Sequence, residues 1–269
     1  MKISIVTISF NQAEFIERTI KSILNQKQDV DIEYIVVDAG STDGSREIIE
    51  SYRDQIDHII FESDNGPADG LNKGFSFATG DIIGYINSDD ILCADALSYV
   101  DNYFRQFKGD VDVLSGAAKL IGPTDEVYRT LYSDVYDPLA FAYSGCILIQ
   151  PSSFFTRDIF FKTKGFNINN KTNWDGELFV DMSIAGAKFR VVSNILSSYR
   201  VHNESITGTM STANKMQTYR REIYTKITGK NISSYSKPAN IYYKYMRKIK
   251  NWRDTYQRIK GGRSFGRAL

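Results

Sequence analysis

A strand-like run followed by two acids occupies residues 82–90, which read Ile82-Ile83-Gly84-Tyr85-Ile86-Asn87-Ser88-Asp89-Asp90. Its first five residues are apolar, small or aromatic, as is typical of a strand buried on both faces of a parallel sheet. Adjacent carboxylates at the end of such a strand can hold Mg²⁺ or Mn²⁺ together with substrate phosphates. The second acid could instead cap the helix that follows.

Similar runs lie on both sides of this stretch and predict a repeating strand–helix order. We expect further strands at 3–8, 34–37, 59–61 and 111–114, with helical patterns between the strands around 15–24, 48–49, 68–78 and 94–107. Such alternation predicts βαβ units and a Rossmann-like α/β fold with a mostly parallel sheet. Ligands bind beyond the carboxyl ends of these strands, where Ser9, Asn11, Asp38 and the acid pair fall.

The second half of the chain has a less regular pattern. We expect strands at 146–149 and 154–155, a helix at 177–185, extended structure around 191–196 and a polar loop at 203–215. From Tyr242 onwards apolar residues recur at helical spacing, at positions 242, 245, 246, 249, 252, 256 and 259.

Charge is distributed unevenly along the chain. From Lys237 to the end there are ten Lys and Arg residues and one acid, whereas the preceding residues hold 23 basic and 31 acidic side chains. Basic residues around an aromatic stripe are the composition of a helix that lies on an anionic membrane. The same spacing also suits a helix packed on the body of the protein or in a homodimer. We expect no nucleic-acid partner.

Two cysteines, Cys93 and Cys146, do not indicate a disulfide framework or a zinc site. The first residues form too short an apolar run for a signal peptide, and no run of about 18 apolar residues occurs. We therefore expect a cytoplasmic protein, with the inner face of the cell membrane as an alternative position.

Five segments taken together resemble glycosyltransferase family 2, whose members have the GT-A fold. They are 6–11, 37–45, 64–74, 78–82 and 87–90, and the likeness continues more weakly to His202. The resemblance implies an inverting, metal-dependent enzyme that moves a hexose-type sugar from a nucleotide-sugar, most often a UDP-sugar. It also implies a glycan or lipid-linked saccharide acceptor in surface-polysaccharide synthesis, such as O-antigen or capsule.

The resemblance assigns roles to the matching residues at the sheet edge. Asp38 should bind the nucleotide base, with Thr7, Ser9 and Asn11 beside it, although Asp38 could simply initiate the turn before Gly40. Asp69 and Lys73 should lie near the base, ribose or phosphates; the alternative for Lys73 is a solvated helix residue. Asp89 and Asp90 should hold Mn²⁺ or Mg²⁺. Asn87 stands where the family often has Asp, so we assign Asn87 and Ser88 to the donor.

The segment Trp174-Asp175-Gly176-Glu177 resembles the part of the family that carries the catalytic base. Asp175 aligns best with that base, Glu177 is its rival, and Asp175 could instead cap the following helix. His202 lies in a segment that approaches the donor diphosphate in the family. Phe154, Phe155 and Trp174 suit an acceptor platform or the core.

The resemblance divides the chain into a catalytic domain at 1–215 and a basic helical appendage at 216–269. Within the catalytic domain, residues 1–115 should bind the nucleotide-sugar and residues 116–215 should bind the acceptor. A nicotinamide-dependent oxidoreductase is disfavoured because no G-x-G-x-x-G follows the first strand. A catalytically degenerate protein of the same fold, which only binds glycan or acts as a scaffold, is the alternative function.

Overall fold

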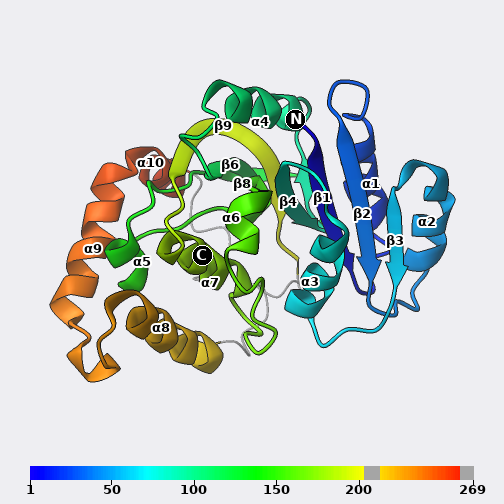
Figure 1. Cartoon of the computed structure of the whole chain (residues 1–269). Coiled ribbons are helices and arrows are strands. Elements are labelled where there is room, and N and C mark those ends of the chain that lie inside the picture. Colours follow the sequence, from blue (N-terminus) through cyan, green and yellow to red (C-terminus); the bar gives the residue numbers. More distant parts are fainter. Residues whose placement is uncertain (203–212, 261–269) are drawn as a thin grey trace.

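One curled sheet runs through the protein, as the computed structural model shows for residues 1–202 and 213–260 (Figure 1). Within these residues nine strands pair in the order β3-β2-β1-β4-β8-β6-β9-β5, and β7 pairs with β6. The strands are β1 (Ile3–Ser9), β2 (Ile32–Asp38), β3 (His58–Phe61), β4 (Ile82–Asn87), β5 (Ile91–Leu92), β6 (Val113–Ile121), β7 (Val127–Leu131), β8 (Ser153–Thr156) and β9 (Phe189–Arg200).

The predicted parallel arrangement holds for the first half of the sheet. Strands β1, β2, β3 and β4 all pair in parallel, and the register brings Ser9 opposite Asp38 and Ile8 opposite Asn87. The carboxyl ends of β1, β2 and β4 therefore meet at one edge. Beyond β4 the sheet is mixed, because β8 pairs antiparallel with both β4 and β6 while β9 runs parallel to β6.

Helices cover both faces of the parallel half, as its alternation of side chains requires. Ile5 packs with α1 (Ile16–Leu24), α2 (Ser45–Ser51) and α4 (Ala96–Gln106). Val6 points to the other face, against α3 (Pro67–Phe77), α6 (Arg157–Phe161) and α7 (Trp174–Ile184). A Cβ on Gly74 would come within 2.5 Å of a Val6 methyl, so a glycine there lets α3 lie directly on β1. This close packing fixes the loop that precedes α3.

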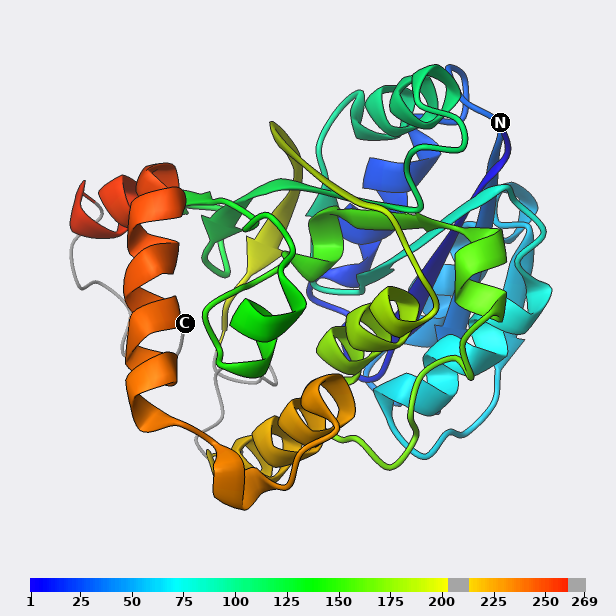
Figure 2. The same cartoon turned by 60° about the vertical axis from the view of Figure 1, so that its left-hand side comes forward.

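The remaining helices lie at the opposite edge of the molecule from β2 and β3 (Figure 1). They are α5 (Pro138–Ala142), α8 (Ala213–Thr228), α9 (Lys237–Lys250) and α10 (Trp252–Lys260), with short 3₁₀ turns at Arg53–Gln55, Gln150–Ser152 and Ile232–Ser234. Figure 2 shows α9 as a long helix along this edge, with α8 and α10 near its two ends. Tyr219 and Ile223 of α8 pack with Val180 of α7. The predicted boundary after residue 215 falls inside α8.

Two local predictions were wrong, and both failed because of hydrogen-bond partners elsewhere in the sequence. Residues 146–149 form no strand, since Ile147 pairs with Asp134 and the Ile149 amide donates to the Ser133 hydroxyl. The stripe at 242–259 is not one helix, because it breaks at Asn251, whose side chain donates to the Tyr132 carbonyl and to Asp134. Residues 203–212 of the predicted polar loop lie outside the described residues, and α8 begins at Ala213.

Glu33 joins β2 to the start of β1 and offers a test of the fold. Its buried carboxylate accepts hydrogen bonds from Lys2 (2.7 Å), Ser4 (2.6 Å) and both the amide (2.7 Å) and hydroxyl (2.6 Å) of Thr79. Burial by itself would raise the pKa of Glu33, but these donors outweigh it and hold the pKa at about 2.

We expect Glu33→Gln to lower the free energy of unfolding at pH 7 by on the order of 3 kcal/mol. Because the folded-state pKa of Glu33 is lowered, its contribution is present above the unfolded pKa near 4.5 and is lost as the pH falls towards 2. Urea unfolding between pH 3 and 7 measures this, with the exposed Glu50→Gln as the control. Equal stability of both variants at pH 7 would contradict the assignment.

Candidate active site

The loop after β2 is organised around Asp38. This carboxylate is fully buried and accepts from the amides of Gly40 and Ser41, the Ser41 hydroxyl and the Arg46 guanidinium. Burial raises the pKa of Asp38, but the hydrogen bonds from Ser41 and Arg46 outweigh that effect and lower it. The geometry thus supports the turn-forming role of Asp38, and its direct contact with a base stays a prediction.

The three β1 residues assigned to the donor differ in their accessibility. The Thr7 side chain is buried and accepts from the Tyr34 hydroxyl (3.1 Å), and its backbone lies within the sheet between β2 and β4, so the contact of Thr7 with a donor stays a prediction. The Ser9 hydroxyl lies at the sheet edge without a hydrogen-bond partner among the described residues. Asn11, with φ of 52°, accepts from the Thr42 amide and donates its own amide to the Ser41 hydroxyl. Asn11 therefore joins the loops after β1 and β2.

The acid pair after β4 is held against the end of β9 and the segment around His202. Asp89 Oδ2 lies 3.1 Å from His202 Nε2, across 113 positions of sequence. Asp90 is fully buried, and its Oδ1 accepts from the Arg200 backbone amide at 2.8 Å. Asn87 ends β4, and the carbonyl of buried Ser88 accepts from the Thr19 hydroxyl.

These residues fit a divalent cation. Asp90 Oδ2 is buried without a partner among the described residues, and its neighbour Asp89 faces an imidazole. Burial, and next the negative charge of Asp89, raise the pKa of Asp90 well above its usual value. A cation would satisfy the orphaned oxygen and favour the ionised form. Among the described residues no group of three or more His, Cys, Asp and Glu side chains is arranged around one point. Mg²⁺ and Mn²⁺ usually take one or two carboxylates from a protein together with substrate phosphates.

Asp69 and Lys73 lie on α3, close to the loop that leads into it. Asp69 accepts from the Asn65 amide (2.9 Å) and from the Asn65 side chain (3.0 Å). Lys73 donates to the Ser63 carbonyl at 2.6 Å and lies 3.6 Å from Glu62. Both side chains hold this loop in shape, and their contact with a donor stays a prediction.

The start of α7 separates the two candidate bases. Glu177 is saturated, because Asn167, Asn170 and Lys226 all donate to its carboxylate at 2.9–3.1 Å. Burial acts to raise the pKa of Glu177, yet these donors lower it overall. Asp175 pairs with no other side chain within the described part of the chain; its carboxylate accepts from the backbone amides of Gly176 and of Asp175 itself, and burial raises its pKa overall. Asp175 is therefore the acid of this segment that is left to take a proton.

Two buried tyrosine hydroxyls lie near Asp175, whose charge acts on both Tyr85 and Tyr219. The Tyr219 hydroxyl has no hydrogen-bond partner among the described residues, and the Tyr85 hydroxyl and the Trp174 indole have none there beyond each other. A Cβ on Gly176 would come within 2.6 Å of the Tyr219 hydroxyl, which places that hydroxyl beside Asp175. Burial, and next the charge of Asp175, raise the pKa of both tyrosines well above the usual value. Both hydroxyls therefore stay protonated and can donate to a substrate oxygen.

Tyr85 also connects the two acidic parts of the site. It lies in β4 two residues before Asn87, and the charges of both Asp175 and Asp90 act on its hydroxyl. Sequence reasoning missed Tyr85, Tyr219 and Arg200. A signal for Tyr85 existed, because it shares its strand face with Asn87. Tyr219 had none, since it comes from a helix 44 residues beyond Asp175.

Arg200 positions the acid loop from within the core. Its fully buried guanidinium donates to the carbonyls of Asp89 (2.7 Å) and Gly122 (2.7 Å), pairs with Asp125 and lies over the Phe15 ring. The Phe15 ring also contacts the His202 ring, with centroids 4.8 Å apart. The predicted aromatic platform, by contrast, belongs to the core, because Phe154, Phe155 and Trp174 are all buried.

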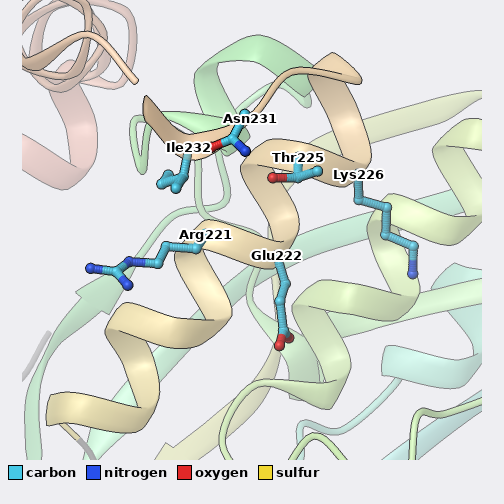
Figure 3. Close-up of a pocket in the computed structure, with 6 residues that line it drawn as sticks. All are labelled: Arg221, Glu222, Thr225, Lys226, Asn231 and Ile232. Carbon is cyan, nitrogen blue, oxygen red and sulfur yellow. The ribbon is translucent and has the colours of Figure 1, made fainter. Parts of the chain in front are cut away.

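A surface pocket lies on α8, outside the start of α7 (Figure 3). It is lined by Arg221, Glu222, Thr225, Lys226, Asn231 and Ile232. None of these is a predicted site residue, and the pocket is connected to the site only through Lys226, which pairs with Glu177 and Asp181. The predicted site residues therefore lie at the sheet edge and the start of α7, and none of them lines this pocket.

Curated relatives of the chain are glycosyltransferases. An uncharacterized glycosyltransferase of Nostoc sp. is 25% identical over 245 residues, which are 87% of this chain and 76% of that protein. A putative teichuronic acid biosynthesis glycosyltransferase of Bacillus subtilis, TuaG, is 36% identical over 98 residues, which are 35% of this chain and 38% of that protein. The chain is thus related to transferases of cell-surface polysaccharides.

Solved structures confirm the GT-A fold. Residues 1–349 of S. aureus TarS in complex with UDP-GlcNAc match with a TM-score of 0.67 and 17% identity, covering 93% of this chain and 73% of TarS 1–349. The mannosyltransferase PcManGT of Pyrobaculum calidifontis, in complex with GDP-Man and Mn²⁺, matches with a TM-score of 0.61 and 16% identity. The match covers 98% of this chain and 76% of PcManGT. The model of the glycosyl transferase family 2 matches residues 4–174. The chain therefore belongs to glycosyltransferase family 2.

Proposed function

We propose that the protein is an inverting hexosyltransferase that takes its sugar from a UDP-sugar and uses Asp175 as the general base. The main observation that supports this proposal is the contrast between two acids of α7. Asp175 is half-buried and pairs with no other side chain among the described residues, whereas Glu177 is saturated by three donors. A raised pKa brings a carboxylate nearer to the working pH, where general-base catalysis is most efficient.

In this proposal Asp175 takes the proton from the acceptor hydroxyl as that oxygen attacks the anomeric carbon. The hydroxyls of Tyr85 and Tyr219 orient the acceptor or the sugar by donating to their oxygens. Asp89, Asp90 and His202 would hold Mn²⁺ or Mg²⁺. When bound, such a cation neutralises the charge that develops on the departing diphosphate.

The donor and the acceptor are inferred from chemistry and from relatives. Ser9 has a free hydroxyl at the edge where β1 and β2 end, next to the loop that Asp38 and Asn11 shape for a nucleotide. TarS has been solved with UDP-GlcNAc, which supports UDP, although PcManGT has been solved with GDP-Man. The relationship to TuaG supports a saccharide or lipid-linked glycan acceptor in surface-polysaccharide synthesis.

A panel of nucleotide-sugars tests the proposal. We expect one UDP-sugar to release UDP in the presence of Mn²⁺ or Mg²⁺, and EDTA to abolish this release. Release of GDP alone would show that the donor is a GDP-sugar and not a UDP-sugar. If every nucleotide-sugar stayed intact while glycans bound, the alternative of a degenerate glycan-binding protein would replace the enzyme.

A further inference from the structure

The outer face of α9 is apolar although it faces solvent. Ile241, Tyr242, Tyr245 and Ile249 are each at least 53% exposed. At 100° per residue these four fall within about 100° of one another around the helix. They therefore form one stripe rather than scattered surface residues.

Helix α10 repeats the pattern beyond the break at Asn251. Trp252, Tyr256 and Ile259 are each at least 54% exposed, and their spacing of four and three residues places them on one side of the helix. We call the seven residues of the two stripes the outer face; they are Ile241, Tyr242, Tyr245, Ile249, Trp252, Tyr256 and Ile259. Large exposed apolar patches of this kind mark an interaction site.

The inner side of α9 is fixed to the body, so the orientation of its stripe is determined. Tyr243 stacks on Tyr143 with ring centroids 5.3 Å apart, and Asn240 donates to the Tyr143 carbonyl. Arg247 pairs with the buried Asp134 at 2.6 Å. These contacts come from positions on the side of α9 opposite the stripe.

The inner side of α10 is tied down by a second cluster around Asp254. This acid is 4% exposed and pairs with Arg247 (3.2 Å), Arg258 (2.7 Å) and Arg129 (3.7 Å). Because Asp254 is the one acid between residues 237 and 260, no carboxylate of these two helices is left at their surface.

Every charge at the surface of α9 and α10 is therefore positive. The exposed basic residues are Lys237, Lys244, Lys248, Lys250, Arg253 and Lys260. In α9, Lys244 and Lys248 lie along one border of the apolar stripe. In α10, Arg253 and Lys260 lie beside the stripe formed by Trp252, Tyr256 and Ile259. An aromatic and aliphatic face bordered by cations is complementary to the surface of an anionic bilayer.

We propose that the outer face binds the surface of an anionic lipid bilayer, with the stripes at the level of the headgroups and the lysines on the lipid phosphates. Within the described residues no helix is long and apolar enough to cross a bilayer, so the contact is peripheral. A second copy of the chain fits less well, because a two-fold contact of this face would bring cations against cations. The proposal does not depend on the catalytic assignment.

Sedimentation of the full chain with vesicles tests the proposal. We expect pelleting with phosphatidylglycerol vesicles at low salt, weaker pelleting at high salt and none with pure phosphatidylcholine. The double variant Ile249→Ser/Trp252→Ser should lower vesicle binding at least tenfold. The charge variant Lys244→Gln/Lys248→Gln/Arg253→Gln/Lys260→Gln should do the same at low salt. These side chains make no ion pair with the described residues, and the Asp134 and Asp254 clusters stay intact.

The control is Phe107→Ser/Ile184→Ser, which removes one aromatic and one isoleucine that are exposed elsewhere. It should bind vesicles like the wild type. Light scattering should show the same mass for all forms, and donor hydrolysis should be unchanged by the outer-face variants. A full chain that stays in the supernatant, or an outer-face variant that binds like the control, would overturn the proposal. A fall in mass on mutating the face would assign it to self-association instead.

Discussion

Asp175→Asn is expected to slow sugar transfer by about 10²–10⁴-fold while leaving the binding of UDP unchanged. The amide has nearly the shape of the carboxylate but cannot take the proton of the acceptor hydroxyl. Asp175 has no side-chain partner among the described residues, so the substitution breaks no ion pair and should not unfold the protein. Turnover measured beside calorimetry of UDP binding separates loss of chemistry from loss of binding.

Glu177→Gln is the matched control, two residues further along the same helix. It should keep most of the activity but lose stability, because it weakens the contacts with Asn167, Asn170 and Lys226. The opposite pattern, with Glu177→Gln inactive and Asp175→Asn active, would transfer the role of base to Glu177.

The dependence of the rate on pH gives a second readout for Asp175. The base acts only when ionised, so activity should rise as the pH rises through its folded-state pKa. Because burial raises that pKa, the acid limb of the kcat/KM profile should lie above the ordinary range near 3.9. Asp175→Asn should remove this limb from the residual activity.

The second large effect is expected for Asp89→Ala. If Asp89 holds the cation that neutralises the diphosphate, its loss should remove several kcal/mol of transition-state stabilisation, which is a fall of at least about 10²-fold in rate. The Asp89 side chain is partly exposed and pairs with His202, so the fold should persist. Calorimetry of Mn²⁺ binding in the presence of UDP should show weakened affinity, independently of activity.

Two further variants make this test specific. Asp110→Ala removes an exposed acid beyond the end of α4 and should change neither Mn²⁺ affinity nor rate. Asp90→Ala should lose activity and also unfold more easily, because the buried carboxylate accepts from the Arg200 amide. Normal turnover of Asp89→Ala in the presence of EDTA would show that the metal assignment is wrong.

The first half of the fold could be predicted from the sequence alone. The runs at 34–37 and 82–86 lack charged and strongly polar residues because parallel strands are covered on both faces. In the helices between the strands, apolar residues recur every three to four positions. These are local signals, and the register then brings Ser9, Asp38 and Asn87 to one edge. The motifs along that edge also identified the family, which the match over residues 4–174 confirms.

Only the tertiary structure decided which polar residues are still free to act. It surrounded Asp38 and Glu177 with donors, left Asp175 without a side-chain donor among the described residues, and placed Tyr219 beside it. It also broke the C-terminal helix at Asn251 and turned the stripe outwards. The physical reason is that burial and hydrogen-bond partners depend on groups far apart in the chain. Asp90 meets Arg200 across 110 positions and Asn251 meets Asp134 across 117, distances at which a local pattern carries no information.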